Sequence, residues 1–142
     1  MPVPNLKDSV ILIVDDMVMM RVLMRRFLQQ SGFTRVLDAE NGQLGLDALH
    51  AQKVDLVLLD IQMPVLDGYQ TLERIKADPS LQDVCVIIVT AVEEIESVAR
   101  CIEMGADDYM PKLFNPILLN AKMQTSLELR YLRSRVRELE GG

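Results

Sequence analysis

Histidine is almost absent from this chain of 142 residues, and its single copy, His50, lies at the end of a predicted helix. A serine or cysteine triad needs a histidine base, so a lone histidine that is best explained as a surface residue effectively excludes that chemistry. Cysteine is also scarce. Cys85 and Cys101 lack the spacing of metal ligands, and we expect them to be reduced, structural thiols in a cytoplasmic protein.

Long apolar runs and excess positive charge are missing too. Although 49% of the residues are hydrophobic, no stretch approaches the roughly 18 apolar residues of a membrane span, and residues 1–8 lack the profile of a signal peptide. The formal net charge of -6 argues against nucleic-acid binding through bulk electrostatics. No Walker loop or GxGxxG pattern occurs, so the chain has no evident nucleotide cradle. We therefore expect one domain without a membrane or a nucleic acid as its direct partner.

Apolar runs alternate with amphipathic segments along the chain. Residues 10–14, 35–39, 54–59, 84–90 and 108–110 are typical of strands, and residues 17–31, 42–51, 68–77, 93–104 and 116–140 are typical of helices. This alternation predicts an α/β fold, a doubly wound five-stranded parallel sheet with helices on both faces. Pro111 ends the short last strand, which we expect at a sheet edge because proline donates no ladder hydrogen bond.

The helical segments carry matching end signals. Gly32 and Gly105 follow the first and fourth helices, Asn41 opens the second, and Asp67 is the expected N-cap of the third. In the first helix, apolar residues recur near helical spacing, which predicts a core stripe that includes most of its methionines. The residues that define this stripe are Val18, Val22, Met24, Phe27 and Leu28.

Three carboxylates follow two of the apolar strands. Asp60 closes one run, and Asp15 and Asp16 follow the run 10–14 in the same way. A carboxylate there is costly unless something pairs with it, and the carboxyl ends of parallel strands form the ligand-binding edge of such sheets. Carboxylates about 4 Å apart repel by roughly 4 kcal/mol at an effective dielectric near 20. The pattern therefore predicts a divalent cation, and Mg²⁺ suits a site with few protein ligands and several waters.

Thr90 and Lys112 end two further strands of the same predicted sheet. Each has an ordinary explanation alone, as a β-branched strand residue and a solvated cation, just as a lone strand-end Asp is usually a turn former. Together with the acids they indicate phosphoryl chemistry. An ionised Asp60 is a nucleophile towards phosphorus, a metal and Lys112 would screen the charge, and Thr90 would donate to a phosphoryl oxygen. The phosphate donor must come from elsewhere, because no nucleotide cradle is evident.

These residues resemble the receiver domain of two-component response regulators, over roughly residues 9–129. The matching segments keep the family's order and spacing: 14–16 (VDD), 59–64 (LDIQMP), 67–68 (DG), 89–91 (VTA) and 105–112 (GADDYMPK). The resemblance implies a flavodoxin-like sheet with strand order 2-1-3-4-5. It also implies that Asp60 accepts a phosphoryl group from a histidine kinase or a histidine phosphotransfer protein. Asp16, Asp60 and the Gln62 carbonyl would ligate Mg²⁺, and Asp15 would act mainly through water.

The resemblance further implies a switch. Thr90 and Lys112 would read the phosphoryl group, and Tyr109 would turn inward when Thr90 moves, which alters the face of the fourth helix, fifth strand and fifth helix. An aromatic that simply packs on the fourth helix is the alternative for Tyr109. One departure stands out: the family usually has a cis proline after the lysine, and here Leu113 follows Lys112. A cis bond at that step would cost roughly 2.5–4 kcal/mol, so the placement of Lys112 needs a structure.

Two other classes compete with a non-enzymatic phosphoacceptor that assists its own phosphorylation and dephosphorylation. The first is a scaffold that is never phosphorylated, and the complete set of acids with Thr90 and Lys112 argues against it. The second is a hydrolase of the haloacid-dehalogenase type, which is expected to carry a second Asp two residues after its nucleophile. Gln62 stands at that position, and no cap domain is evident.

Residues 116–140 predict one helix of roughly 37 Å, which is long for a helix that only covers a sheet. Leu129, Leu132, Val136 and Leu139 follow the spacing of a and d positions in two heptads. In a parallel pair, Glu128 would meet Arg133 of the second copy, and Arg135 would meet Glu140. We favour such a homodimer over a frayed, unpartnered amphipathic helix. The expected division is a receiver domain at 9–129 and a helical extension at 130–142 that leads toward an output domain.

Overall fold

Strands and helices alternate throughout the computed structural model, which describes residues 5–91, 95–112 and 115–141. The elements are β1 (Val10–Val14), α1 (Val18–Gln30), β2 (Arg35–Ala39), α2 (Gly42–Ala51), β3 (Leu56–Leu59), α3 (Gly68–Ala77), β4 (Cys85–Thr90), α4 (Ile95–Glu103), β5 (Asp108–Pro111) and α5 (Pro116–Gly141). Two short 3-10 helices, η1 (Leu6–Asp8) and η2 (Pro79–Leu81), were not predicted. β3 begins at Leu56 rather than at 54, and β5 includes Pro111.

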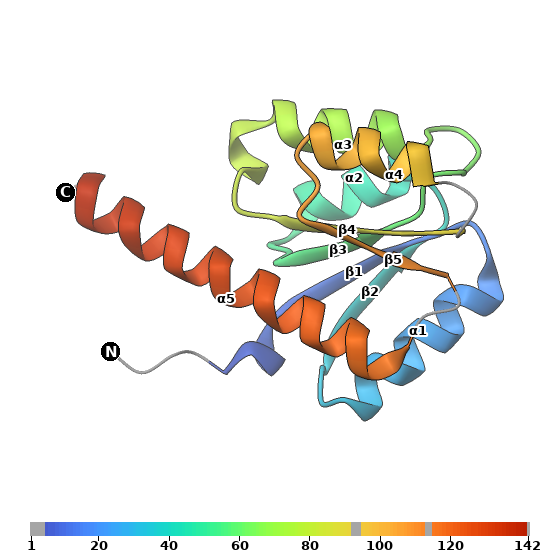
Figure 1. The fold of residues 1–142 in the computed structure, drawn as a ribbon, viewed down its shortest axis with the longest axis horizontal. Coiled ribbons are helices and arrows are strands. Elements are labelled where there is room, and N and C mark those ends of the chain that lie inside the picture. Colours follow the sequence, from blue (N-terminus) through green and yellow to red (C-terminus); the bar gives the residue numbers. More distant parts are fainter. Residues whose placement is uncertain (1–4, 92–94, 113–114, 142) are drawn as a thin grey trace.

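The strands form one parallel sheet in the order β2-β1-β3-β4-β5, which confirms the predicted α/β architecture (Figure 1). β5 lies at the edge, as Pro111 predicted, and Pro111 pairs in register with Thr90 of β4. The central strands β1, β3 and β4 are buried along nearly their whole length, which explains why their sequences are continuously apolar.

Helices cover both faces of the sheet, α2, α3 and α4 on one side and α1 and α5 on the other (Figure 1). Alternate residues of β1 point to opposite faces. Leu12 and Val14 pack in the cluster that includes Leu72 and Ile75 of α3, whereas Ile11 and Ile13 join the cluster with α1 and α5. Both faces are therefore apolar, and polar side chains gather at the ends of the strands.

The core stripe of α1 differs from its prediction. Its buried residues are Met20, Met24 and Leu28, four residues apart, whereas Val18 is 61% exposed and Val22 is 44% exposed. The prediction that Val18 and Val22 belong to the core was wrong, because apolar side chains occur on two faces of this helix and periodicity alone does not choose between them. The second face stays at the surface beside the carboxyl edge of the sheet.

The loop after β3 is folded back tightly onto the strand. Asp67 caps α3 as predicted, in a capping box with Gln70. The Gly68 N–H donates to the Ile61 carbonyl at 2.7 Å, and a Cβ at Gly68 would collide with the backbone oxygen of Asp60. Val65 adopts a left-handed φ of 70°, which is a strained conformation for a β-branched residue. This loop therefore fixes the backbone directly after Asp60.

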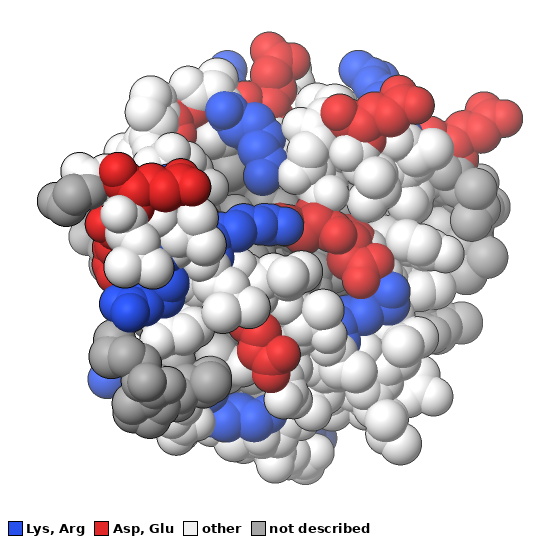
Figure 2. All heavy atoms as spheres, turned by 60° about the vertical axis from the view of Figure 1, so that its left-hand side comes forward, with Lys and Arg blue, Asp and Glu red and all other residues white. Residues whose placement is uncertain are grey.

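α5 is continuous from Pro116 to Gly141 and extends beyond the sheet at the amino ends of the strands (Figure 1). Its first half packs on the core through Leu119, Met123 and Leu127. The predicted a and d residues are exposed by 45% to 76%: Leu129, Leu132, Val136 and Leu139. Figure 2 turns this end of the molecule forward and shows acidic and basic side chains side by side rather than a patch of one sign.

Three smaller observations complete the fold. His50 is exposed at the end of α2, where its ring lies 2.8 Å from Asp78, which confirms its surface location. Cys85 and Cys101 are both free and buried, as expected of structural thiols. Among the described helices, none combines the length and the apolar character that crossing a membrane requires.

Candidate functional site

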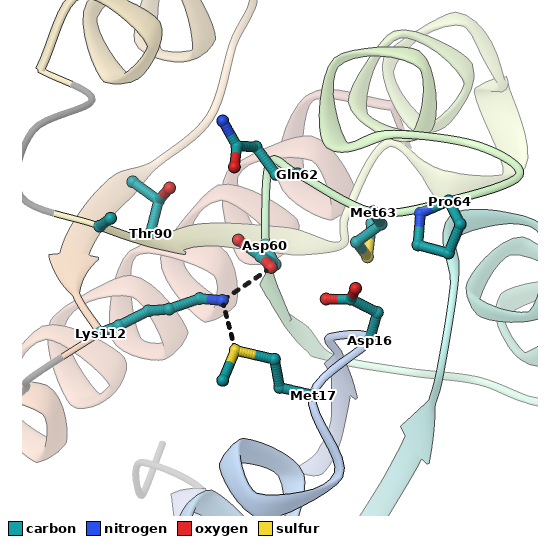
Figure 3. A pocket seen from close by; sticks show the side chains of 9 residues that line it. Asp16, Met17, Asp60, Gln62, Met63, Pro64, Thr90 and Lys112 are labelled. Carbon is teal, nitrogen blue, oxygen red and sulfur yellow. Dashed lines mark hydrogen bonds and ion pairs between the residues drawn. The ribbon is translucent and has the colours of Figure 1, made fainter.

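The polar residues predicted from strand ends meet at the carboxyl edge of the sheet. Asp60 directly follows β3, and its N–H donates to the Val14 carbonyl at 3.0 Å, so the ladder between β3 and β1 continues into the site. Lys112 directly follows β5, and its N–H donates to the Thr90 carbonyl at 2.7 Å. Their side chains point into one open cleft (Figure 3). The residues that line it are Asp16, Met17, Asp60, Gln62, Met63, Pro64, Thr90, Ala91 and Lys112.

Three acids gather closely at one side of this cleft. Asp15, Asp16 and Asp60 each offer a carboxylate oxygen, and these oxygens all lie within 4.8 Å of one another. Asp15 and Asp60 are only 2% exposed, whereas Asp16 is exposed. Carboxylates held so close together repel each other unless cations or protons balance them, so the cluster is a candidate site for a hard cation with oxygen ligands.

The two oxygens of Asp60 have different surroundings. Oδ1 accepts a hydrogen bond from the Ile61 N–H at 2.8 Å. Oδ2 is buried and 3.0 Å from the Lys112 ammonium, yet within the described chain no donor is aligned to give it a hydrogen bond. Burial raises the pKa of Asp60 to about 6, with a further increase from Asp15, while Lys112 acts in the opposite direction. The ionised Asp60 carboxylate is therefore poorly hydrated, and one of its oxygens faces the cleft.

Lys112 is the cation of the site. Its Nζ lies 3.0 Å from Asp60 Oδ2 and 3.6 Å from Asp15 Oδ2, and it donates to the Met17 sulfur at 3.4 Å. Burial lowers the pKa of Lys112, but the close ion pair with Asp60 and the charges of the neighbouring acids outweigh it and leave the pKa raised. The Lys112–Leu113 peptide bond, whose isomer was in question, lies outside the described residues. The lysine nevertheless points at Asp60.

Asp15 is held mainly by its own loop. Its Oδ1 accepts a hydrogen bond from the Met17 N–H at 2.8 Å, and its backbone oxygen accepts one from Arg21 Nη1 at 2.6 Å. Burial raises the pKa of Asp15 as well. Met17 and Arg21 were not singled out by the sequence analysis. Their one signal in the sequence is their position in the segment that follows the two acids.

The remaining predicted residues lie at different depths. Thr90 is buried at the end of β4 and lines the cleft, and Gln62 is exposed on its rim. Tyr109 does not line the cleft. Its ring is half-buried against the cluster that covers the α2, α3 and α4 face, with the Lys122 ammonium 5.7 Å from the ring centroid. The structure therefore brings together Asp15, Asp16, Asp60, Thr90 and Lys112, and holds Tyr109 apart.

Comparison with known proteins shows which family the chain is similar to. The family model "Response regulator receiver domain" matches residues 11–124. The cyclic di-GMP phosphodiesterase of Thermotoga maritima is 38% identical over 122 residues, which cover 84% of this chain and 31% of that protein. "Probable transcriptional regulator ycf27" of Guillardia theta is 37% identical over 117 residues, 82% of this chain and 44% of that protein.

Solved structures agree. The signal receiver domain of a DNA binding response regulator from Colwellia psychrerythraea superimposes with a TM-score of 0.78 at 30% identity, covering 85% of this chain and 99% of that one. The chain spans less than half the length of the two curated relatives described above. The family match, the sheet order and the acids at its carboxyl edge all agree, and the chain belongs to the response regulator receiver domain family.

Proposed function

We propose that this receiver domain accepts a phosphoryl group on Asp60, in an Mg²⁺-dependent reaction, from a histidine kinase or a histidine phosphotransfer protein. The observation that carries the proposal is the Oδ2 atom of Asp60. Among the described residues it is the one buried side-chain oxygen or nitrogen without a hydrogen bond, and it faces a cleft that also holds a lysine and two more acids. Its neighbouring cation is the Lys112 ammonium at 3.0 Å, which also lies 3.6 Å from Asp15, so a further cation in the cleft would balance charge that one lysine leaves uncompensated.

The donor set fits Mg²⁺. The three clustered carboxylates are ligands that this ion prefers, and their number leaves room for water. We assign Asp16, Asp60 and the Gln62 carbonyl as ligands, with Asp15 acting mainly through water. The bound ion would supply positive charge that offsets the charge on a transferring phosphoryl group.

The protein's own residues would position the transfer. A carboxylate oxygen of Asp60 forms a bond to phosphorus while the bond from phosphorus to the donor's histidine nitrogen breaks, and that nitrogen keeps the electron pair. Lys112 Nζ already lies 3.0 Å from Asp60, so it would screen the added negative charge. The Thr90 hydroxyl would donate to a phosphoryl oxygen from the next strand of the sheet.

Phosphorylation would then switch the face made by α4, β5 and α5. The added charge favours a state in which Thr90 and Lys112 are drawn toward Asp60. Lys112 and Tyr109 belong to the same short segment, and the Lys112 N–H is bonded to Thr90, so a shift at Thr90 acts on β5 directly. Tyr109 would turn inward as the population shifts. Its half-buried ring is the starting position for that movement.

The exposed face of α1 supports the docking of a protein phosphodonor. Met17 lines the cleft, and Val18, Met19, Val22 and Leu23 continue an apolar surface from it, each exposed by 44% or more. Large apolar patches next to a reactive group are typical of interaction sites. We therefore infer that the phosphodonor docks here, and that the exchange occurs in the cytoplasm, where two free thiols are expected to stay reduced.

Incubation with Mg²⁺ and acetyl phosphate tests the proposal by intact-mass measurement. We expect the mass of one added phosphate. It should not form when EDTA replaces Mg²⁺, nor in Asp60→Asn. It should form in the matched control Asp47→Asn, which changes an exposed carboxylate on α2. Stable single labelling supports the phosphoacceptor. Rapid multiple turnover would indicate a hydrolase, against which Gln62 already argues, and no labelling would indicate a scaffold.

We further propose that residues 9–129 are the receiver, that residues 130–142 lead toward an output domain, and that two copies pair through the extension. The exposed stripe of Leu129, Leu132, Val136 and Leu139 supports the homodimer.

The names of the relatives state different activities, a transcriptional regulator and a cyclic di-GMP phosphodiesterase, while each matches over less than half of its length. We infer that the shared segment is the input, with no direct contact to nucleic acid or membrane. Sedimentation showing a monomer at high concentration, with and without phosphorylation, would contradict the dimer.

A further inference from the structure

Two acids at the amino edge of the sheet are built in the same way. Asp55 directly precedes β3, and its Oδ2 accepts the Val10 N–H of the neighbouring strand β1 at 2.7 Å. Asp107 directly precedes β5, and its Oδ2 accepts the Val86 N–H of the neighbouring strand β4 at 2.8 Å. In both residues Oδ1 faces an arginine of α5 instead. Each acid therefore joins the sheet to the helix that leaves the domain.

The two arginines are held with very different strength. Arg130 Nη2 lies 2.9 Å from Asp55 Oδ1, and Arg130 Nε donates to the Asp83 carbonyl at 2.8 Å, with only 18% of the arginine side chain exposed. Arg133 Nη1 lies 3.6 Å from Asp107 Oδ1, and 61% of its side chain is exposed. Exposed pairs of this kind contribute little. Arg130 is thus a firm anchor of the helix, and Arg133 is loosely held.

The heptad positions separate these arginines by role. With Leu129 and Leu132 at a and d, Arg130 falls at position b, on the side of α5 that faces the sheet. Arg133 falls at position e, next to the a and d residues along which the two helices of the dimer would pack. In a parallel pair the e position faces the preceding g position of the other helix, which is Glu128. Arg133 accordingly has two acidic partners available, Asp107 in its own chain and Glu128 of a second copy.

We propose that Arg133 exchanges these partners, so that Asp107 of each chain competes with dimerisation through α5. The proposal rests on the homodimer proposed above and adds its regulation. Release of Arg133 leaves the Asp107 bond to Val86 in place, and the Arg130 anchor keeps the helix directed along its present path. The exchange is therefore local and costs no buried hydrogen bond. Asp107 stands two residues before Tyr109, so the competing acid directly precedes β5, the strand that the phosphorylation switch is proposed to move.

The dimerisation constant of the full chain, measured by sedimentation velocity over a concentration series, tests the exchange. Asp107→Asn keeps an acceptor oxygen for the Val86 N–H but removes the charge that holds Arg133. With two such sites in a dimer, we expect dimerisation to tighten by about 2- to 20-fold. The matched control is Asp83→Asn, which removes the acid paired with Arg137. Arg137 is at a second b position and does not reach the other helix, so this variant should dimerise like the unmodified chain.

Two backgrounds complete the test. In Glu128→Gln the released arginine has no acid to meet, and in Arg133→Gln there is no arginine to release, so in both the Asp107→Asn gain should vanish. Circular dichroism melts of every variant show that each chain is folded. A gain that persists in either background, or a dimer that Asp107→Asn leaves unchanged, overturns the exchange while the dimer stands. A monomer for every variant at the highest concentration overturns the dimer and the exchange with it.

Discussion

Replacing Asp60 with asparagine is expected to stabilise the protein in the absence of Mg²⁺. Asp60 is 2% exposed, and the change removes a charge from a site with two neighbouring acids. Its pKa is raised from 3.8 to about 6. At about 1.4 kcal/mol per pKa unit, ionisation of Asp60 lowers the free energy of unfolding by about 2–3 kcal/mol at pH 8.

The pH dependence distinguishes this origin from a general packing effect. The folded state binds the Asp60 proton more tightly than the unfolded state, so this contribution lowers stability as pH rises between 3.8 and about 6. Asparagine lacks that titration. The advantage of Asp60→Asn should therefore be about 2–3 kcal/mol at pH 8 and should shrink toward zero near pH 4. The groups facing Asp60 are Asp15 and Asp16 after β1 and Lys112 after β5, and all three remain in the variant.

Urea unfolding in EDTA, followed by circular dichroism at several pH values, measures the difference. Asp47→Asn on the surface of α2 is the control and should change little at any pH. Adding Mg²⁺ should stabilise the unmodified chain by mass action and Asp60→Asn much less. An Asp60→Asn variant that is less stable at pH 8, or equally favoured at pH 4 and pH 8, would refute the reasoning.

The loop after β3 and the buried thiols give three further tests. Gly68→Ala should lose about 2–4 kcal/mol in urea unfolding, because its Cβ meets backbone of Asp60 and Ile61, whereas Gly141→Ala, with open space around it, should be near neutral. Val65→Asn should gain about 1 kcal/mol by relieving a left-handed β-branched residue that is 78% exposed, and an unchanged midpoint would contradict the strain. Burial raises the pKa of Cys85 to about 12, so iodoacetamide at pH 8 should label neither Cys85 nor Cys101 before unfolding, as counted by mass.

Much of the fold could be predicted from the chain because its core strands are covered on both faces. A strand of that kind is apolar at every position, so the runs at 10–14 and 84–90 indicated both their conformation and their central location. Pro111 placed β5 at the edge by its missing donor. The face of α1 could not be chosen in this way, since Val18 and Met20 are both apolar and packing decides which one is buried.

The residues of the candidate site that meet because parallel strands end at one edge could be predicted from the sequence. The contacts that depend on side-chain conformation could not. Parallel strands end at one edge, so residues directly after them had to meet, which explains why Asp15, Asp60 and Lys112 were found together. The contacts of Arg21 with the Asp15 carbonyl and of Lys112 with the Met17 sulfur depend on rotamers and on the path of α1. The spacing of these residues in the sequence does not predict either contact.

Acids stand at both ends of the strands, and what separates their roles is how many acids share one cation. At the amino edge, Asp55 and Asp107 each accept a backbone N–H with one oxygen and face an arginine of α5 with the other, so each acid has a basic partner of its own. At the carboxyl edge, Asp15, Asp16 and Asp60 gather within 4.8 Å, and Lys112 lies 3.0 Å from Asp60 and 3.6 Å from Asp15. A carboxylate with its own arginine gains little from a further cation. A cluster of three acids beside one lysine gains much more, which is why we place the proposed chemistry at the carboxyl edge and the attachment of α5 at the amino edge.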